Sequence, residues 1–148
     1  AHTDDGLVAA YIEGDLKAFS TIVERHRARL LWVARRYGHN EDDAQDILQE
    51  ALFRASYSLH TWRHESSLST WLHRLVMNSG WDFRTTESLG RLHPDQRRAL
   101  WLIDIEGYTI GHVAKQEGVQ PGTIKSRRNR AREALRADLG ECSVAPGR

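Results

Sequence analysis

The chain has 148 residues, of which 40% are hydrophobic and 28% charged, and its formal net charge is +1. This composition is typical of a globular protein and excludes an intrinsically disordered chain. No run approaches the roughly 18 apolar residues that a membrane span needs, and no signal peptide is recognisable, so we expect no membrane insertion. The single cysteine, Cys142, excludes an internal disulfide and a thiolate zinc cage within one chain, and favours a reducing, cytoplasmic location.

Apolar residues recur at helical spacing along the chain, and no stretch alternates long enough to indicate a sheet. In the first half this pattern predicts four helices. They are a short one from Asp4 that Gly14 ends, a long one capped by Asp15 that Gly38 ends, a third capped by Asn40, and, after a polar loop at His60–Ser67, a fourth that carries Leu68 to Val76.

The helical pattern lapses between Trp81 and Arg91, which indicates a domain boundary. Beyond it, the sequence predicts three more helices: one from Pro94 that Gly107 ends, a short one capped by Thr109 that Gly118 ends, and a basic one from Pro121 toward Leu139. The predicted fold is therefore all-α, with a domain over residues 1–84, a linker over 85–91, and a second domain over 92–148 that ends in a loose tail.

The net charge of +1 conceals an uneven distribution. Residues 1–84 carry 10 basic and 12 acidic side chains, whereas residues 85–148 carry 11 and 8. Five acids and no base lie in residues 41–50, and six bases and one acid lie in residues 125–136. We therefore expect two charged surfaces of opposite sign, one in each domain.

The strongest local pattern, in residues 107–132, has the spacing of a helix-turn-helix, with Val113, Ala114, Val119 and Ile124 as its small core. Polar and basic residues follow at the start of the second helix, where a recognition helix meets base edges and phosphates. The alternative, a solvated basic face, is weaker because six bases follow the motif directly. The predicted duplex-binding residues are Thr123, Lys125, Ser126, Arg127 and Arg130.

A second pattern is the acidic stripe of Asp43, Asp46 and Glu50, which share one side of a predicted helix. Three carboxylates at this spacing suit a divalent cation, a basic protein surface or simply solvent. A helix lacks the loop geometry that hard cations prefer, so the last two readings are favoured over a metal.

A third pattern combines aromatic, basic and small polar residues between Tyr57 and Trp81. Such side chains form stacking platforms for unpaired bases. Trp71 lies among leucines and is better explained as a core residue, while Trp62 suits either role. The eight histidines form no usual ligand set, and no nucleophile–base arrangement or phosphate loop is present, so we predict no metal, no cofactor, no catalytic residue and no enzyme activity.

Together, three segments resemble the extracytoplasmic-function (ECF) sigma factors of the sigma-70 family of bacterial RNA polymerase. They are DDAQDILQEAL (42–52), WRHESSLSTWLHRLVMNSGWDF (62–83) and EGYTIGHVAKQEGVQPGTIKSRRNRAR (106–132), and the resemblance covers residues 5–138. It implies that residues 1–84 are sigma region 2, which docks on core polymerase and recognises and melts the minus-ten element. Residues 92–148 are then sigma region 4, which reads the minus-thirty-five element.

The resemblance also implies residue roles. By this resemblance, the helix that carries Asp43, Asp46, Gln49 and Glu50 docks on the polymerase. The residues that capture a flipped minus-ten base are Trp62, Arg63, His64, Ser66, Ser67, Arg74 and Asn78. The helix from Gly122 to Arg132 reads the minus-thirty-five duplex. The implied partners are core RNA polymerase, promoter DNA as duplex and as melted strand, and a membrane-bound or soluble anti-sigma factor. An ordinary helix-turn-helix regulator that does not depend on polymerase, and a module that only blocks polymerase, are the competing readings.

Two features depart from the family pattern. His112 stands where the family usually has an acid, and Glu117 where it usually has an apolar residue. In addition, the ten residues between Trp81 and Arg91 span about 35 Å when extended, against about 70 Å between promoter elements two helical turns apart. We therefore expect the tether near Arg84–Thr85 to be incomplete.

Overall fold

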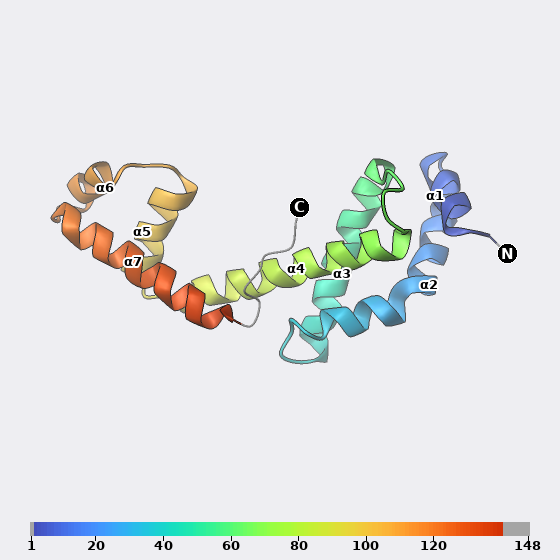
Figure 1. The fold of residues 1–148 in the computed structure, drawn as a ribbon, viewed down its shortest axis with the longest axis horizontal. Coiled ribbons are helices and arrows are strands. Elements are labelled where there is room, and N and C mark those ends of the chain that lie inside the picture. The colour runs from blue at the N-terminus through green and yellow to red at the C-terminus, as the bar shows by residue number, and fades with distance from the viewer. Residues whose placement is uncertain (1, 141–148) are drawn as a thin grey trace. The chain divides into compact units, whose positions relative to one another are not determined.

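The computed structural model describes residues 2–140, so Cys142 lies outside the described part. Within that part the secondary structure is helical throughout, as predicted. The elements are α1 Asp4–Ile12, α2 Leu16–Ala34, α3 Glu41–Ser58, η1 Leu59–Thr61, α4 Leu68–Arg91, α5 Pro94–Leu100, η2 Trp101–Ile105, α6 Ile110–Glu117 and α7 Pro121–Asp138 (Figure 1). The chain forms two compact units, and the boundary between Phe83 and Arg84 falls within α4.

Local capping explains where the helices of the first unit begin. Asp15 accepts a hydrogen bond from the backbone N–H of Lys17 at 3.1 Å, and Asn40 accepts one from the N–H of Asp43 at 2.8 Å. Such side chains satisfy N–H groups that have no partner inside the helix. Both caps were predicted from the sequence.

The core of the first unit lies where α1, α2, α3 and the first turns of α4 meet. Its most completely buried side chains are Ile22, Leu30, Val33, Leu48, Leu59, Leu68, Leu72 and Val76. Trp71 is only half-buried but packs against this cluster, which agrees with its predicted core role. At Gly80, a Cβ atom would lie 2.3 Å from the Tyr37 ring, so this position of α4 has no room for a larger residue.

Residues 85–91, expected as a linker, are helical and continue α4 to Arg91. Leu89 and the following Leu92 pack with Leu100, Ala131 and Leu135 in a small cluster of the second unit. This packing gives the last turns of α4 a tertiary partner, which outweighs the weak helical pattern of Thr85–Thr86.

The second unit has a core of Ala99, Val113, Ala114 and Ile124 where α5, α6 and α7 meet, against which Val119 packs, as predicted. The helix expected from Pro94 through Ile105 is divided, because α5 ends at Leu100 and a π-turn, η2, follows. The wider turn directs both Leu102 and Ile103 toward the core while Trp101 and Ile105 remain exposed.

Candidate nucleic-acid interfaces

The helix-turn-helix of α6 and α7 is fixed by local chemistry at each end. Thr109 caps α6 by accepting a hydrogen bond from the N–H of His112 at 3.1 Å. Gly118 ends it in the left-handed region with φ 70°, where glycine carries no steric penalty. Pro121 then opens α7 at a position that needs no N–H donor. These residues set the turn between α6 and the recognition helix.

Glu117, which departs from the family pattern, has a structural role. Its carboxylate lies 2.5 Å from Nε of Arg98, an ion pair that joins the end of α6 to α5. The side chain of Glu117 is three-quarters covered by the protein. A covered carboxylate needs a partner, and Arg98 supplies it.

Four of the five predicted duplex-binding residues are exposed on α7: Thr123, Lys125, Ser126 and Arg130. The exception is Arg127, which is partly buried and whose guanidinium lies 3.8 Å from the carboxylate of Asp95. Helical spacing places Thr123, Ser126, Arg127 and Arg130 along one side of the helix, a suitable arrangement for entry into a groove.

Arg128 forms an internal contact. It binds the carboxylate of Asp104 through two nitrogens, with the shortest contact at 2.6 Å, and its hydrogen bond lowers the pKa of Asp104. Arg128 follows buried Ile124 by four residues and precedes buried Ala131 by three, so it falls on the inner stripe of α7. Sequence reasoning recognised a basic run here but did not separate this inward arginine from the outward ones.

In the first unit, a cavity of about 500 Å³ opens between the loop before α4 and the start of α1. Four predicted minus-ten residues line it: Trp62, His64, Ser66 and Ser67. The other three do not line it. Arg63 and Arg74 are exposed, and Asn78 on α4 is largely buried.

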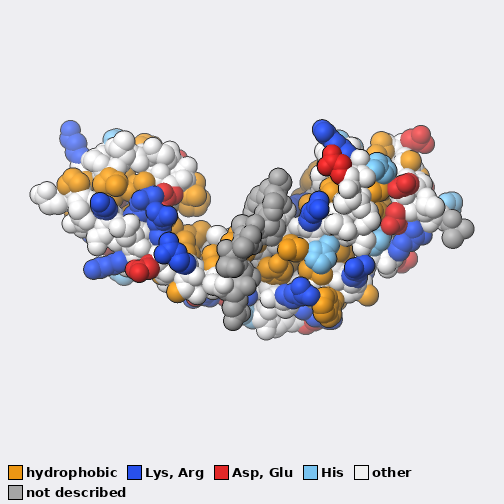
Figure 2. Space-filling view, in the orientation of Figure 1, with side chains coloured by type: hydrophobic (Ala, Val, Ile, Leu, Met, Phe, Trp, Pro, Cys, Tyr) orange, Lys and Arg blue, Asp and Glu red, His pale blue; other side chains and the backbone are white. Residues whose placement is uncertain are grey.

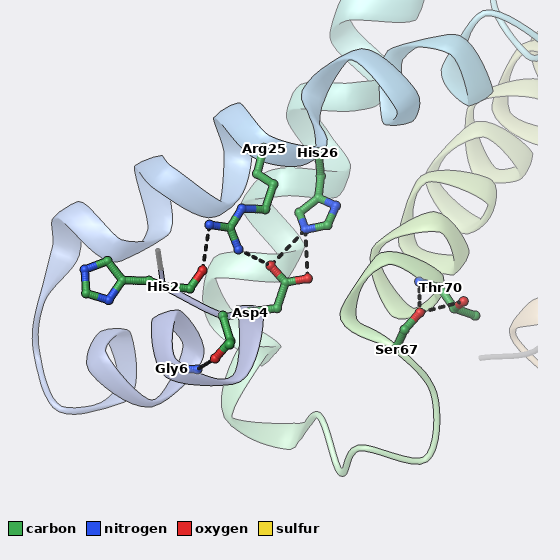
Figure 3. Close-up of polar contacts among 8 residues, drawn as sticks. His2, Asp4, Gly6, Arg25, His26, Ser67 and Thr70 are labelled. Carbon is green, nitrogen blue, oxygen red and sulfur yellow. Dashed lines mark hydrogen bonds and ion pairs between the residues drawn. The ribbon is translucent and has the colours of Figure 1, made fainter.

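The loop around the cavity is held in one conformation. Trp62 is only 8% exposed, and its indole N–H donates to the carbonyl oxygen of Ser66 at 3.0 Å. The ring of His64, whose φ is 62°, lies 3.9 Å from the Trp62 ring centre to centre. Ser67 caps α4 by accepting a hydrogen bond from the N–H of Thr70 at 3.1 Å (Figure 3). The cavity wall is therefore preformed.

Sequence reasoning missed the contribution of α1, which supplies Asp4 and Asp5 to the cavity lining. Asp4 is held by Arg25 at 2.9 Å and by His26 at 3.2 Å, both from α2, and Arg25 also donates to the carbonyl of His2 (Figure 3). Asp5 lies 3.5 Å from the imidazole of His64. No pattern in the sequence indicates these contacts, because they join residues 21 to 59 positions apart.

The acidic stripe of α3 divides into a capping residue and exposed residues. Asp43 is partly buried, and its carboxylate accepts a hydrogen bond from the N–H of His39 at 3.0 Å, so it supports the start of the helix. Asp46, Gln49 and Glu50 are exposed. Glu50 pairs with Arg54 at 3.2 Å, which leaves Asp46 as the carboxylate of this group without an ion pair among the described residues.

The exposed side of α3 continues into two aromatic residues, Phe53 and Tyr57. Sequence reasoning did not single out Phe53, and it grouped Tyr57 with the aromatic pattern of the following loop and helix. Phe53 is 55% exposed and Tyr57 65% exposed, and their rings meet edge to face with centres 4.7 Å apart. At helical spacing both lie on the side of Asp46, so the acidic surface ends in an apolar one. A mixed surface of this kind is typical of protein interfaces.

Two other kinds of site are absent from residues 2–140. In this range no helix is long and apolar enough to cross a membrane. In the same range no three His, Cys, Asp or Glu side chains gather in a way that would hold a metal ion.

Comparison with known families agrees with this geometry. The family described as Sigma-70 region 2 matches residues 22–88, and the one described as Sigma-70, region 4 matches residues 83–135. The first match includes the cavity loop and α3, and the second includes both helices of the helix-turn-helix.

Curated relatives share most of the chain. An ECF RNA polymerase sigma factor, SigM of Mycobacterium tuberculosis H37Rv, is 33% identical in an alignment 167 positions long that covers 93% of this chain and 85% of SigM. The ECF RNA polymerase sigma-E factor of Escherichia coli K12 is 27% identical over 90% of this chain and 92% of its own length. The chain belongs to the ECF sigma factors of the sigma-70 family. It is a promoter-specific transcription initiation factor, and a regulator that acts without polymerase is not favoured.

Among solved structures, this chain matches CnrH, determined in complex with the cytosolic domain of CnrY. That chain is 27% identical, with a TM-score of 0.47, and the match covers 91% of this chain and 96% of CnrH.

Proposed function

We propose that this chain docks on core RNA polymerase through α3, holds a flipped base of the melted minus-ten element in the cavity before α4, and reads the minus-thirty-five duplex with α7. The observation that carries the proposal is the preformed cavity in a unit that matches Sigma-70 region 2, joined in one chain to a region 4 helix-turn-helix. The protein acts on promoter DNA as a binding factor, without an enzyme active site of its own, in the cytoplasm.

The docking surface consists of Asp46, Gln49 and Glu50, extended by Phe53 and Tyr57. Asp43 takes part indirectly by fixing the first turn of α3. An exposed carboxylate that is not neutralised within the chain attracts a basic partner surface and steers the encounter. The aromatic pair supplies apolar area that the carboxylates lack.

The cavity suits a single nucleobase. Extrusion of a base from the duplex costs a few kcal/mol, which the pocket must offset by stacking and hydrogen bonding. The exposed ring of His64, tilted against the largely buried ring of Trp62, offers an aromatic surface, and Asp5 and Glu65 offer acceptors. Carboxylates accept from exocyclic amino groups and repel phosphates, so we expect a base with an amino group to be preferred at this position.

On α7, Lys125, Arg127 and Arg130 serve as phosphate and base contacts, with Thr123 and Ser126 beside them. Arg127 has to exchange its long contact with Asp95 for one with DNA. Arginine suits this exchange because its planar guanidinium donates to two acceptors at once.

The tether between the two regions is a further proposal: the native chain has additional residues near Arg84–Thr85. The two family matches overlap at residues 83–88, so no separate linker remains between them. The alignment with SigM is 167 positions long but uses 93% of this chain, about 138 residues. Mass measurement of the full-length protein from its native source tests this directly: a mass of 17.0 kDa contradicts the proposal.

An anti-sigma factor is the expected regulator. Structures with similarity to this chain include, by their titles, CnrH with CnrY and a sigma factor RpoE with the anti-sigma factor NepR. Regulation of this chain in the same way is proposed by analogy with those proteins.

The decisive experiment adds the purified chain to core polymerase on a linear promoter template. We expect run-off transcripts without any other sigma factor, and loss of those transcripts with Asp46→Ala or with Lys125→Ala. Transcription that still requires a housekeeping sigma factor identifies a regulator and contradicts the proposal, and pure inhibition identifies a blocking module.

A further inference from the structure

α2 exposes a tryptophan that neither the core nor the proposed sites use. Trp32 is 58% exposed, and the guanidinium carbon of Arg36 lies 4.3 Å from the centre of its ring. Arg29 is also exposed and precedes Trp32 by three residues, so the two lie on one side of α2, and Arg36 reaches the Trp32 ring from the turn that follows the helix. We call this surface, together with His73 of α4, the Trp32 face.

The arginines of this face differ from the neighbouring arginines of α2 and of the turn after it. Arg25 is paired with Asp4 and Arg35 with Glu41. Within residues 2–140, Arg29 and Arg36 have no ion pair with an acid. Their positive charge is therefore available to an external anion.

His73 links the face to α4. Burial lowers its pKa, and the nearby charges of Arg29 and Arg36 lower it further. The positive charges of both arginines therefore reach His73, which belongs to α4. In the space-filling view, basic, histidine and hydrophobic side chains gather over α2 and α4, whereas the acidic ones of this unit lie mainly toward α1 (Figure 2).

We propose that the Trp32 face binds single-stranded DNA, with phosphates on Arg29 and Arg36 and a base stacked on Trp32. Unneutralised cations beside an exposed aromatic ring are the features that bind a single strand without reading its sequence. An acidic peptide would satisfy the arginines but would leave the ring without a stacking partner. The assignment of the strand as the melted promoter strand rests on the proposed function.

The position of the face supports this path. His73 follows Ser67 by six residues of α4, which is about 9 Å along the helix axis. Ser67 lines the base cavity, and exposed Arg74 directly follows His73 on α4. A strand with one base in the cavity can therefore continue along α4 to Trp32, which gives the melted DNA a second, sequence-independent attachment.

The test measures binding of a fluorescein-labelled twelve-residue oligothymidine to the full chain by anisotropy over a series of salt concentrations. Trp32→Ala is expected to weaken binding by about 5- to 150-fold, the range for loss of one stacked base. The double variant Arg29→Ala/Arg36→Ala is expected to reduce the magnitude of the slope of log K against log salt by about 1.4, because two phosphate contacts on a single strand are lost.

Arg27→Ala is the matched control, since Arg27 is exposed on the opposite side of α2 and has no ion pair within the described residues. Its salt slope is expected to equal that of the wild type. Equal effects of Arg27 and Arg29/Arg36 variants overturn the proposal, as does an unchanged affinity of Trp32→Ala. Displacement of the oligonucleotide by poly-glutamate with the same dependence on Trp32 indicates an acidic protein partner and also overturns it.

The outcome is independent of the transcription assay. Loss of oligothymidine binding in Trp32→Ala with intact run-off transcription supports the face but not its place on the melted strand. Absence of transcription with intact oligothymidine binding contradicts the proposed function alone.

Discussion

The two units position their candidate DNA-binding residues by different means. In the second unit, Thr123, Ser126 and Arg130 lie on a regular helix, and their shared direction follows from the spacing alone. In the first unit, the cavity combines a loop with residues of α1 that lie far away in the sequence. The difference teaches that a duplex-reading surface can be located from periodicity, whereas a pocket for one base depends on tertiary packing.

The units also differ in the size of their cores. We expect the largest effect on stability from a substitution in the smaller core. The buried residues of the second unit form two small clusters, one of four residues that includes Ile124 and one of three. Truncation of a buried isoleucine to alanine costs about 2 to 5 kcal/mol, comparable to the stability of a domain of this size. Ile124→Ala is therefore expected to unfold the second unit at 25 °C while the first unit stays folded.

Amide hydrogen exchange of the full chain, resolved by residue, measures this. The matched variant is Ile22→Ala, which removes an equally buried side chain from the larger cluster of the first unit. It is expected to lower the melting temperature without loss of protection at 25 °C. Equal loss of protection in both units after either change would show that they unfold together.

The next effect separates outward from inward basic residues on α7. Lys125→Ala is expected to weaken binding of a minus-thirty-five duplex and to reduce its salt slope by about 0.9, the value for one phosphate. Arg128→Ala is expected instead to lower thermal stability, since it removes the partner of Asp104. Anisotropy and thermal melts on both variants test this contrast, and core polymerase binding serves as the control that neither should alter.

A similar division is expected on α3. Asp43→Ala removes the bond to the N–H of His39 and is expected to destabilise the first unit by about 1 kcal/mol. Asp46→Ala is expected to leave stability within about 0.5 kcal/mol and to weaken docking on core polymerase. Denaturant titration and a polymerase pull-down distinguish the two. The assignment fails if Asp43→Ala alone weakens docking.

The smallest expected effect is the loss of stability at low pH. Because Arg128 lowers the pKa of Asp104, their ion pair stabilises the folded state above the ordinary pKa of an aspartate, near 3.8, and this stabilisation is lost as the pH falls through the lowered value. The pair is partly exposed, so we expect a contribution below about 1 kcal/mol. Asp104→Asn should therefore be less stable than wild type at pH 6 in urea titrations, and this difference in stability should shrink as the pH is lowered.

Much of the fold could be predicted from the sequence, because caps and glycines are local signals. Asn40, Thr109 and Gly118 act as expected. The division at Leu100 was not predicted, since a π-turn leaves no distinct pattern in the sequence. The helical state of residues 85–91 was also missed, because it depends on contacts of Leu89 and Leu92 with α5 and α7.

The candidate sites divide in the same way. Exposure of Lys125 and Arg130 follows from helical periodicity. The capping role of Asp43, the bond from Trp62 to Ser66 and the pairing of Arg128 are matters of side-chain geometry that composition does not encode. The contribution of Asp4 and Asp5 needs the packing of α1 against α2, which arises only in the folded unit.

Asp4 and Asp5 of α1 line the cavity but lie outside the region that defines the family match. The Sigma-70 region 2 match begins at residue 22, whereas α1 ends at Ile12. A fragment cut at the family boundary would keep every residue of the cavity loop and lose the carboxylate wall opposite it. If the cavity holds a base as proposed, substitutions in this N-terminal helix alter base selection, and comparison of the matched region alone would overlook them.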